Sequence, residues 1–385
     1  MRVLFLTTVF PNPAQPTRGT FNRALMDAMA ATDEVRVVAP ISWREGIRRK
    51  AAAVMSDDGS VSHPVYYYPP GILRAAYGWF LWQSVRRAVA RVVESFRPEA
   101  ILAYWAHPDG EVALRIGRAL GVPVGQIVGG SDVLLLARRG ARRRQIIGVL
   151  EGVDCVFTVG SHLRDEVVKM GVSPERVHAL AKGVDAARFF PGDRSAARLR
   201  LDLPGSVPIL LWVGNMVPVK GLPVLLAACA LLLQRGVDFR LCLVGDGPLR
   251  KSLTAQVRDL GLGDRVAFVG PVLQERLPDW YRAANLTVLS SYSEGIPNVL
   301  TESLACGTPF VATRVGGIAE IAADGAGDLV AAGDAEALAS AMARGLARPP
   351  ATALPSVRRS WSDSAAEIVR ELRRRSVERS LRPPS

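Results

Sequence analysis

One stretch of the chain, residues 286–313, restricts the possible folds more than any other: LTVLSSYSEGIPNVLTESLACGTPFVAT. The apolar run at 286–289 predicts a buried parallel strand, and the Ser, Glu, Gly and Pro residues at 290–297 predict a loop. Asn298 can then begin a helix, and a second apolar run after it predicts another strand. Strand, loop, helix and strand in this order are typical of an open α/β sheet, which binds its ligands beyond the carboxyl ends of the strands.

Two carboxylates belong to this stretch. Glu294 follows the first strand at its carboxyl end, and Glu302 lies on the predicted helix. Backbone amides at the helix N-terminus near Asn298 favour an anion, whereas an ionised carboxylate accepts hydrogen bonds from hydroxyl groups. An anion site beside two carboxylates suits a ligand with phosphates between two polyols, such as a sugar nucleotide. The alternative is a solvated loop glutamate and a helix-face glutamate that share no ligand.

The segment from Glu294 to Glu302, EGIPNVLTE, resembles the E-x7-E signature of family 4 glycosyltransferases, which have the GT-B fold. The surrounding residues, SEGIPNVLTESLACGTPFVAT and then VGG, are similar to the family as well. The resemblance implies an α/β protein with two Rossmann-like α/β/α domains facing a central cleft and a C-terminal helix that crosses back to the N-terminal domain. It also implies a retaining, metal-independent enzyme whose co-substrate is a nucleoside diphosphate sugar, with no further cofactor.

The domain boundaries follow from this resemblance and from local composition. A chain of 385 residues is long enough for two domains with separate cores. We predict an acceptor-binding domain over 1–188, a linker rich in Pro, Gly, Ser and Arg over 189–208, and a domain that binds the nucleotide sugar over 209–360. The predicted returning helix covers 361–378.

The loop GNMVPVKG, after the apolar strand ILLWV, resembles a phosphate-binding loop of the family that reads G-R-x4-K-G. Lys220 matches the family lysine, but Asn215 stands where the family has an arginine, so one cationic phosphate contact is missing. The turn GDGP at 245–248 also matches the family. The resemblance implies donor contacts from the following residues: Gly19, Gly214, Asn215, Lys220, Gly245, Val269, Glu294, Gly295, Ile296, Pro297, Asn298, Val299 and Glu302.

Four residues are predicted to carry the chemistry. Glu294 would orient the transferred sugar through its hydroxyls, and Lys220 would stabilise charge on the departing diphosphate together with the amides near Asn298. His107, in the sequence WAHPDG just past a predicted strand, and Asp132, in GGSD, are expected on the acceptor side. The alternatives are a structural histidine and an aspartate that caps the next helix. Glu302 is expected to hold the ribose.

The scattered cysteines argue against a metal site and against disulfides. Cys155, Cys229, Cys242 and Cys306 lie in apolar surroundings, and the sequence contains no C-x-x-C pair or cysteine–histidine cluster. Free thiols buried in a reducing cytoplasm are therefore expected, and no bound metal. No apolar run in the sequence reaches the length of a membrane span.

The formal net charge of +12 calls for an anionic partner. Basic clusters occur at 44–50 and 138–144, but nucleic-acid motifs and aromatic–basic interleaving are missing from the sequence, so we expect no nucleic acid. An anionic membrane surface is favoured instead, with a cytoplasmic protein at the inner face. The helical pattern at 73–96, with Trp79 and Trp82 among arginines, predicts either a helix lying on a bilayer or one packed on the core.

The first loop and WAHPDG most resemble transferases of bacterial envelope or exopolysaccharide synthesis. The resemblance implies a glycan or lipid-linked acceptor. Two other functions remain open at this point. A non-hydrolysing sugar-nucleotide epimerase would need catalytic carboxylates beyond those found, and a catalytically weak sugar-nucleotide-binding partner of another transferase is suggested by Asn215.

Overall fold

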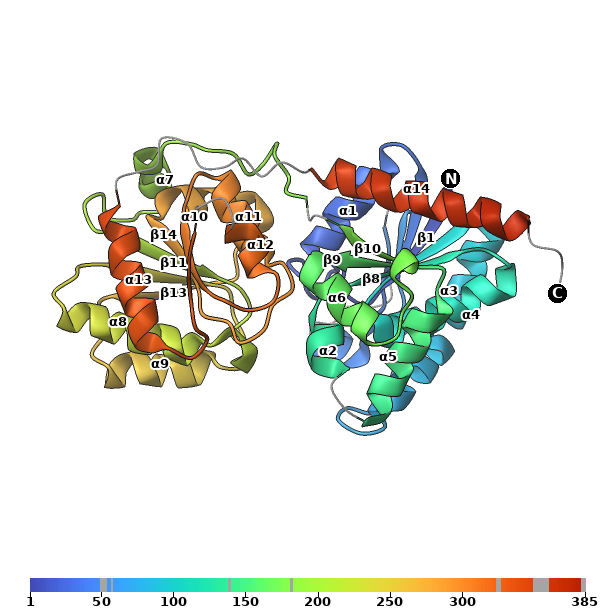
Figure 1. The fold of residues 1–385 in the computed structure, drawn as a ribbon, viewed down its shortest axis with the longest axis horizontal. Helices are drawn as coiled ribbons and strands as arrows, with labels where there is room; N and C mark the ends of the chain where they lie inside the picture. Colours follow the sequence, from blue (N-terminus) through green and yellow to red (C-terminus); the bar gives the residue numbers. More distant parts are fainter. Residues whose placement is uncertain are drawn as a thin grey trace. The chain divides into compact units, whose positions relative to one another are not determined.

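The structure is a computed structural model that describes residues 1–48, 54–56, 58–137, 140–180, 183–322, 327–348 and 360–381. The chain forms two compact units (Figure 1). The first unit combines Met1–Gly183 with Trp361–Ser385, and the second is Val184–Ser360. The last helix of the chain, α14 (Trp361–Ser380), is therefore part of the first unit and packs beside α1 (Thr20–Ala30).

The first unit is built on a sheet in the order β10-β9-β8-β7-β1-β2-β5-β4, parallel except for the antiparallel edge strand β4. The strands are β1 (Arg2–Thr7), β2 (Glu34–Val38), β4 (Val54–Met55), β5 (Val61–His63), β7 (Ala100–Tyr104), β8 (Val124–Val128), β9 (Cys155–Val159) and β10 (Val177–Leu180). Two further short strands, β3 (Ile41–Ser42) and β6 (Val65–Tyr66), pair with each other. Its other helices are α2 (Trp43–Arg48), α3 (Tyr77–Phe96), α4 (Glu111–Leu120), α5 (Gly140–Gly152) and α6 (Ser161–Lys169).

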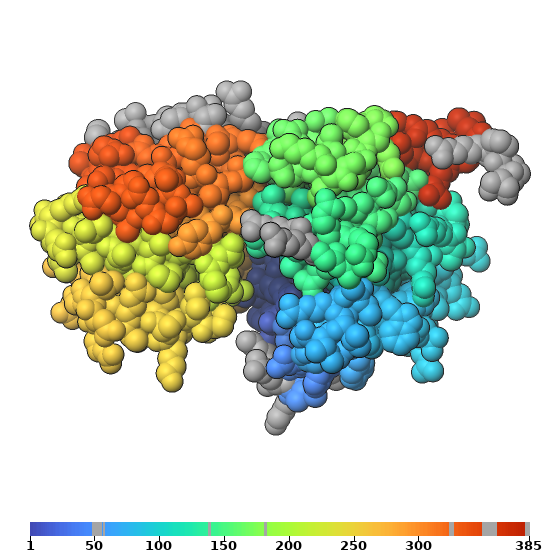
Figure 2. Space-filling model, turned by 60° about the horizontal axis from the view of Figure 1, so that its bottom comes forward, coloured from blue at the N-terminus to red at the C-terminus, as the bar shows by residue number. Residues whose placement is uncertain are grey.

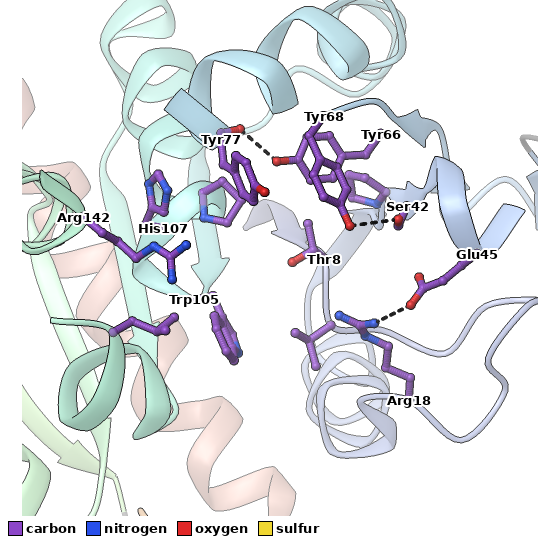
Figure 3. A pocket seen from close by; sticks show the side chains of 14 residues that line it. Thr8, Arg18, Ser42, Glu45, Tyr66, Tyr68, Tyr77, Trp105, His107 and Arg142 are labelled. Atoms are coloured by element: carbon purple, nitrogen blue, oxygen red, sulfur yellow. Dashed lines mark hydrogen bonds and ion pairs between the residues drawn. The ribbon is translucent and has the colours of Figure 1, made fainter. Parts of the chain in front are cut away.

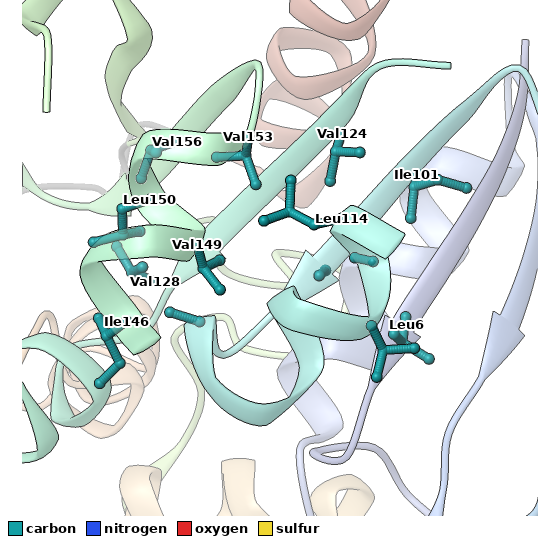
Figure 4. Packing of buried hydrophobic residues seen from close by; sticks show 14 of the residues in the cluster. Leu6, Ile101, Leu114, Val124, Val128, Ile146, Val149, Leu150, Val153 and Val156 are labelled. Carbon is teal, nitrogen blue, oxygen red and sulfur yellow. The ribbon is translucent and has the colours of Figure 1, made fainter. Parts of the chain in front are cut away.

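The central strands are apolar on both faces because helices cover both faces of the sheet. Alternate residues of β1 enter different cores. Leu4 and Leu6 pack beneath α3, α4 and α5, whereas Val3 and Phe5 pack beneath α1 and α14. Figure 4 shows the first of these cores, in which Ile101 of β7, Val124 of β8 and Ile146 of α5 belong to one cluster with Leu6.

Helix α3 packs its main apolar face on the core. Leu81, Val85 and Val89 recur at helical spacing and are buried in the same cluster as Leu4. A short 3₁₀ turn at Arg74–Ala76 precedes the helix. Of the two interpretations of residues 73–96, the core-packing helix is confirmed.

The second unit contains a parallel sheet in the order β13-β12-β11-β14-β15-β16. Its strands are β11 (Ile209–Val213), β12 (Arg240–Val244), β13 (Val266–Gly270), β14 (Leu286–Leu289), β15 (Phe310–Thr313) and β16 (Gly327–Val330). Its helices are α7 (Arg194–Arg200), α8 (Leu222–Gln234), α9 (Arg250–Asp259), α10 (Leu277–Ala283), α11 (Asn298–Ala305), α12 (Ile318–Ala322) and α13 (Ala335–Ala347). The strand, loop, helix and strand predicted at 286–313 are confirmed as β14, a loop, α11 and β15.

The segment predicted as a linker, 189–208, is instead built into the second unit. It contains α7, whose N-terminus is capped by the Asp193 carboxylate accepting from the Ala196 amide (2.6 Å). Arg198 is buried and donates to the Ala283 carbonyl (3.0 Å) and to Oδ1 of Asn285 (2.6 Å). Composition predicted a linker, but the buried hydrogen bonds of Arg198 fix the segment to the end of α10 and to Asn285 before β14.

Candidate functional site

The carboxyl ends of β11, β12 and β14 bring three loops together in the second unit. Gly245, after β12, has φ +126°, and a Cβ atom there would lie 1.8 Å from the carbonyl oxygen of Gly214, after β11. Only glycine permits this approach of two backbones. The amide of Met216 donates to the Asp246 carbonyl (2.8 Å), which ties the two loops together. Both predicted glycines thus form the edge at which a parallel sheet binds ligands.

Lys220 and Glu294 meet at this edge. Nζ of Lys220 lies 2.6 Å from Oε1 of Glu294, and the Ser291 hydroxyl donates to the same oxygen (2.6 Å). The two loops that carry them are also joined by their backbones, since the Tyr292 amide donates to the Val219 carbonyl (2.8 Å). The predicted phosphate lysine and the predicted sugar glutamate therefore form one ion pair, mostly shielded from solvent, with 23% and 10% of their side chains exposed.

The remaining residues of the E-x7-E stretch surround the start of α11. The helix begins at Asn298, as predicted, after Pro297. Oδ1 of Asn298 is buried and has no hydrogen-bond partner in the described part of the chain. The Gly317 amide donates to the Gly295 carbonyl (3.0 Å), which draws the loop after β15 over this turn. Ile296 is buried, and Val299 packs into the core under α11.

Glu302 is held by a tyrosine that the sequence pattern did not single out. The Tyr281 hydroxyl, on α10, donates to Oε2 of Glu302 (2.7 Å). Burial and the nearby Glu302 charge hold the pKa of Tyr281 well above its ordinary value, so the hydroxyl remains a donor. This contact fixes the orientation of a carboxylate that is expected to bind hydroxyl groups.

Asn215 and Val269 differ in their exposure at this edge. Asn215 is exposed after β11, while Val269 packs against the core beneath β13. A cation that the sequence pattern did not reveal lies close to both loops: Arg250, at the start of α9, stacks over the Phe268 ring at 5.6 Å and lies 3.8 Å from Asp246. Gly19 belongs to the first unit, before α1, where the Val9 carbonyl excludes a larger residue.

The first unit contains a cavity of about 230 Å³ at the carboxyl ends of β1 and β7 (Figure 3). Three tyrosines approach it from one side, and Trp105 from another. Arg18 forms an ion pair with Glu45 (3.2 Å) on one wall, whereas the guanidinium of Arg142 points into the cavity from the opposite wall. The lining residues are Thr8, Val9, Arg18, Pro40, Ser42, Glu45, Tyr66, Tyr68, Tyr77, Trp105, His107, Pro108, Leu136 and Arg142.

His107 lines the cavity but is almost fully buried. Nε2 donates to the Arg74 carbonyl (2.9 Å), and Nδ1 lies 2.5 Å from Oε1 of Glu111. Because a carbonyl oxygen only accepts, Nε2 must carry a proton. Both ring nitrogens have protein partners, so the imidazole is fixed in one orientation at the cavity wall.

Asp132 does not line the cavity. Its carboxylate is 1% exposed and accepts hydrogen bonds from the amides of Ala106, Gly129, Gly130 and Val133, at 3.0–3.4 Å. Burial raises the pKa of Asp132 to about 6, and these amides act in the opposite direction. The carboxylate holds two strand-end loops together and does not cap the helix that follows, because Ser131 is the N-cap residue there and Asp132 is the first helical residue.

A second buried carboxylate, Asp109, was not singled out from the sequence. It accepts from the Thr8 amide (2.8 Å) and hydroxyl (3.1 Å), and so connects η2 (Ala106–Gly110) to the end of β1 at the cavity floor. Burial raises the pKa of Asp109 to about 8. Its Oδ1 is buried and has no partner among the described residues. In the sequence, only its place beside His107 in WAHPDG could have pointed to Asp109 as a site residue.

The described residues also bear on metal sites, membrane-spanning helices and disulfides. They contain no group of three His, Cys, Asp or Glu side chains placed to hold a metal ion. No helix among them has the length and apolar character needed to cross a membrane. All four cysteines are buried free thiols, as predicted. Of the basic clusters, Arg49, Lys50, Arg138 and Arg139 lie outside the described residues.

Comparison with known proteins extends over both units. Residues 19–183 match a glycosyl transferase 4-like domain, and residues 207–348 match the glycosyl transferases group 1. D-inositol 3-phosphate glycosyltransferase 1 of Catenulispora acidiphila is 34% identical over 374 residues, which cover 90% of this chain and 86% of that protein. A second such enzyme of the same bacterium is 40% identical over 255 residues, and there the match spans only 59% of the relative's length.

The solved structures that are similar have the predicted fold. Sucrose-phosphate synthase from Thermosynechococcus elongatus is 25% identical, with a TM-score of 0.76 over 99% of this chain and 98% of that chain. Anabaena HepE, solved in complex with UDP-glucose, is 19% identical with a TM-score of 0.68 over 99% and 98% of the two chains. The GT-B fold is confirmed, and the chain belongs to the group 1 glycosyltransferases, with a family 4-like N-terminal domain.

Proposed function

We propose that this protein transfers a sugar, with retention of configuration and without a metal ion, from a nucleoside diphosphate sugar to a glycan or lipid-linked acceptor. The observation that carries the proposal is the meeting of Lys220 and Glu294 beside the N-terminus of α11. A cation and free helix amides can neutralise a diphosphate, and an adjacent carboxylate can accept from sugar hydroxyls. The UDP-glucose complex of the similarly folded HepE supports a donor of this class.

The second unit is assigned to the donor, and different residues are assigned to its diphosphate, its sugar and its ribose. Lys220 and the amides at Asn298 would stabilise the departing diphosphate, which carries more negative charge in the transition state than in the bound donor. Glu294 would orient the sugar, and Glu302, fixed by Tyr281, would hold the ribose. The backbone of Gly214 and Gly245 would approach the phosphates closely, with Gly295, Ile296, Pro297 and Val299 shaping the turn around them.

The acceptor is assigned to the cavity of the first unit. Sugar rings pack well on aromatic side chains, and Tyr66, Tyr68 and Tyr77 provide such a wall. His107 would form part of the cavity wall, and Asp132 and Asp109 would position the loops that carry it. A phosphorylated polyol is a second candidate acceptor. It is suggested by the names of the inositol phosphate relatives and by Arg142, whose Nε has no hydrogen-bond partner in the described residues.

The proposed cellular role is synthesis of bacterial envelope polysaccharide or exopolysaccharide at the inner face of the cytoplasmic membrane. The positive charge of the chain supports an anionic membrane surface as a partner. The epimerase and the weak binding partner are less well supported, because the comparisons extend over both units and name transferases.

A thermal-shift screen against UDP-, GDP- and ADP-sugars tests the donor assignment, because a ligand that binds only the folded protein raises its melting temperature. The donor identified in this way is then incubated with candidate acceptors. Transfer with retained anomeric configuration, unaffected by a chelator, is the expected result. An epimerised nucleotide sugar, or binding without any product, would overturn the proposal in favour of one of the alternatives.

A further inference from the structure

The stretch 67–79 of the first unit, between β6 and α3, exposes four large apolar or aromatic side chains. Tyr67 is 62% exposed, Ile72 64%, Leu73 63% and Trp79 54%. Single exposed apolar residues are common on protein surfaces, but several on one short stretch mark an interaction surface. This group is called the apolar stretch below.

The fold holds the apolar stretch in place. The Tyr67 amide donates to the Ser84 hydroxyl on α3 (3.0 Å), and the Gly71 amide donates to the Tyr77 hydroxyl (3.2 Å). Leu73 adopts a left-handed conformation, φ +49°, which is unfavourable for a residue with a branched side chain. Because these two hydrogen bonds tie the loop to α3, the four apolar side chains are held exposed in the folded unit.

The same stretch forms a wall of the acceptor cavity. Tyr66 and Tyr68 line the cavity, and because side chains alternate along extended chain, Tyr67 between them points to the outer side. Tyr77, which also lines the cavity, donates from its hydroxyl to the Pro69 carbonyl (2.9 Å). One segment therefore presents aromatic side chains to the cavity and apolar side chains to the surroundings.

Positive charge lies next to the apolar stretch. The 3₁₀ turn Arg74–Ala76 packs against α5. Burial lowers the pKa of Arg142, and the nearby positive charge of Arg74 lowers it further. Arg143 and Arg144 continue this cationic turn of α5. In Figure 2 the blue surface that contains the stretch borders the green surface of α5.

We infer that the apolar stretch, together with Arg143 and Arg144 of α5, docks the first unit on an anionic lipid bilayer. Apolar side chains beside arginines suit the boundary between headgroups and acyl chains, where each type finds its preferred surroundings. The inference deepens the proposed function and rests on it: a docked stretch places the tyrosine wall of the cavity at headgroup level. The acceptor is then a lipid-anchored molecule whose polar head enters the cavity.

Co-sedimentation with vesicles tests this inference. The full chain is mixed with vesicles of phosphatidylcholine alone or with one third phosphatidylglycerol, at low and at physiological salt. The wild type should bind only the anionic vesicles, less strongly at higher salt. Ile72→Ser combined with Leu73→Asn should lower the binding at least tenfold at both salt concentrations, whereas Arg143→Gln with Arg144→Gln should lower it mainly at low salt.

Two matched variants control for general changes of surface. Leu199→Ser removes an even more exposed apolar side chain from the second unit, and Arg258→Gln removes an exposed cation from α9. Both should bind vesicles as the wild type does. Binding by the Ile72/Leu73 variant that equals the wild type, or a loss shared by the Leu199 control, would overturn the inference.

Donor binding separates this inference from the proposed function. The thermal shift with the nucleotide sugar should be unchanged in the vesicle-binding variants, since none of their residues belongs to the donor or acceptor site. A wild type that binds the donor and transfers sugar but ignores anionic vesicles would overturn the docking surface alone. A wild type that binds vesicles but no nucleotide sugar would overturn the proposed function.

Discussion

The ammonium group of Lys220 lies 2.6 Å from the carboxylate of Glu294, although 74 residues separate the two in the chain. These are the groups assigned to the diphosphate and to the sugar of the donor. A bound donor must give each a new partner, because separating a largely shielded ion pair without replacement is costly. A nucleotide sugar can do so, with phosphate oxygens for the lysine and hydroxyls for the glutamate.

Lys220→Ala is expected to lower kcat/KM for the donor about 10- to 100-fold, equivalent to ~1.4–2.8 kcal/mol. The variant loses the cation assigned to the diphosphate and leaves Glu294 without its ion-pair partner. Steady-state kinetics with varied donor measure the effect. Lys251→Ala, an exposed lysine on α9, is the control and should behave as the wild type. A change of less than twofold for Lys220→Ala would contradict the phosphate assignment.

Glu294→Gln should lower kcat about 10- to 1,000-fold, or ~1.4–4 kcal/mol of transition-state stabilisation. Positive charge develops at the anomeric carbon as the diphosphate leaves, and glutamine keeps the shape but removes the negative charge. The Ser291 hydroxyl can still donate to the amide oxygen, so folding should be preserved. Wild-type turnover by a variant that melts at the wild-type temperature would refute the assigned role.

Glu302→Gln and Tyr281→Phe should resemble each other and differ from Glu294→Gln. The ribose changes little in charge during the reaction, so losing its contact removes binding that is equal in ground and transition states. Both variants should raise the donor KM several-fold with kcat nearly unchanged. Phenylalanine retains the packing of the buried ring and removes only the 2.7 Å hydrogen bond to Glu302. A large fall in kcat without a rise in KM would argue for a chemical role instead.

Asn215→Arg should leave kcat/KM unchanged or increase it. The exposed side chain at the end of β11 can be lengthened without disturbing a core, and an arginine there would supply the cationic contact typical of the family. Donor affinity and turnover are measured side by side with the wild type. A loss of tenfold or more would show that Asn215 has a specific role, or that Arg250 already occupies the position of the missing cation.

The elements of the second unit could be predicted because their patterns are local. Strands buried on both faces are continuous apolar runs, and β14 covers the predicted residues. Asn298 was predicted to begin α11 because Pro297 and the preceding loop residues interrupt regular structure. The partners of the side chains were not predictable in this way. The contacts from Glu294 to Lys220 and from Glu302 to Tyr281 depend on how distant strands are ordered in the sheet.

The acceptor side was less accessible to prediction for the same reason. His107 was expected at the carboxyl end of β7, and it lines the cavity, but its contacts with Glu111 and with the Arg74 carbonyl depend on the packing of α3. Asp132 has the appearance of an ordinary cap in sequence, yet it accepts from the amide of Ala106, in the loop after a neighbouring strand. Of the tyrosine wall, Tyr77 begins α3, whereas Tyr66 and Tyr68 come from a short segment without a recognisable period.

Stability should fall as pH rises, because of Asp109. Burial raises its pKa from the ordinary value of 3.8 to about 8, so between these values the folded protein holds a proton that the unfolded chain has released. The free energy of unfolding must therefore decrease across this range. Asp132, with a pKa raised to about 6, acts in the same direction at the acidic end. Asp109→Asn should flatten the pH dependence of chemical unfolding, and an unchanged slope would contradict the buried-proton assignment.

Helix α14 has a consequence for the order in which the chain can fold during synthesis. Ile368 and Leu372 complete a core that also contains Phe5 and Phe157, so the first unit lacks part of its interior until the last helix leaves the ribosome. The second unit, Val184–Ser360, is synthesised in full before that point. The half of the protein that is made first is therefore completed only once α14 has been made, and until then its unfinished apolar face is prone to aggregation.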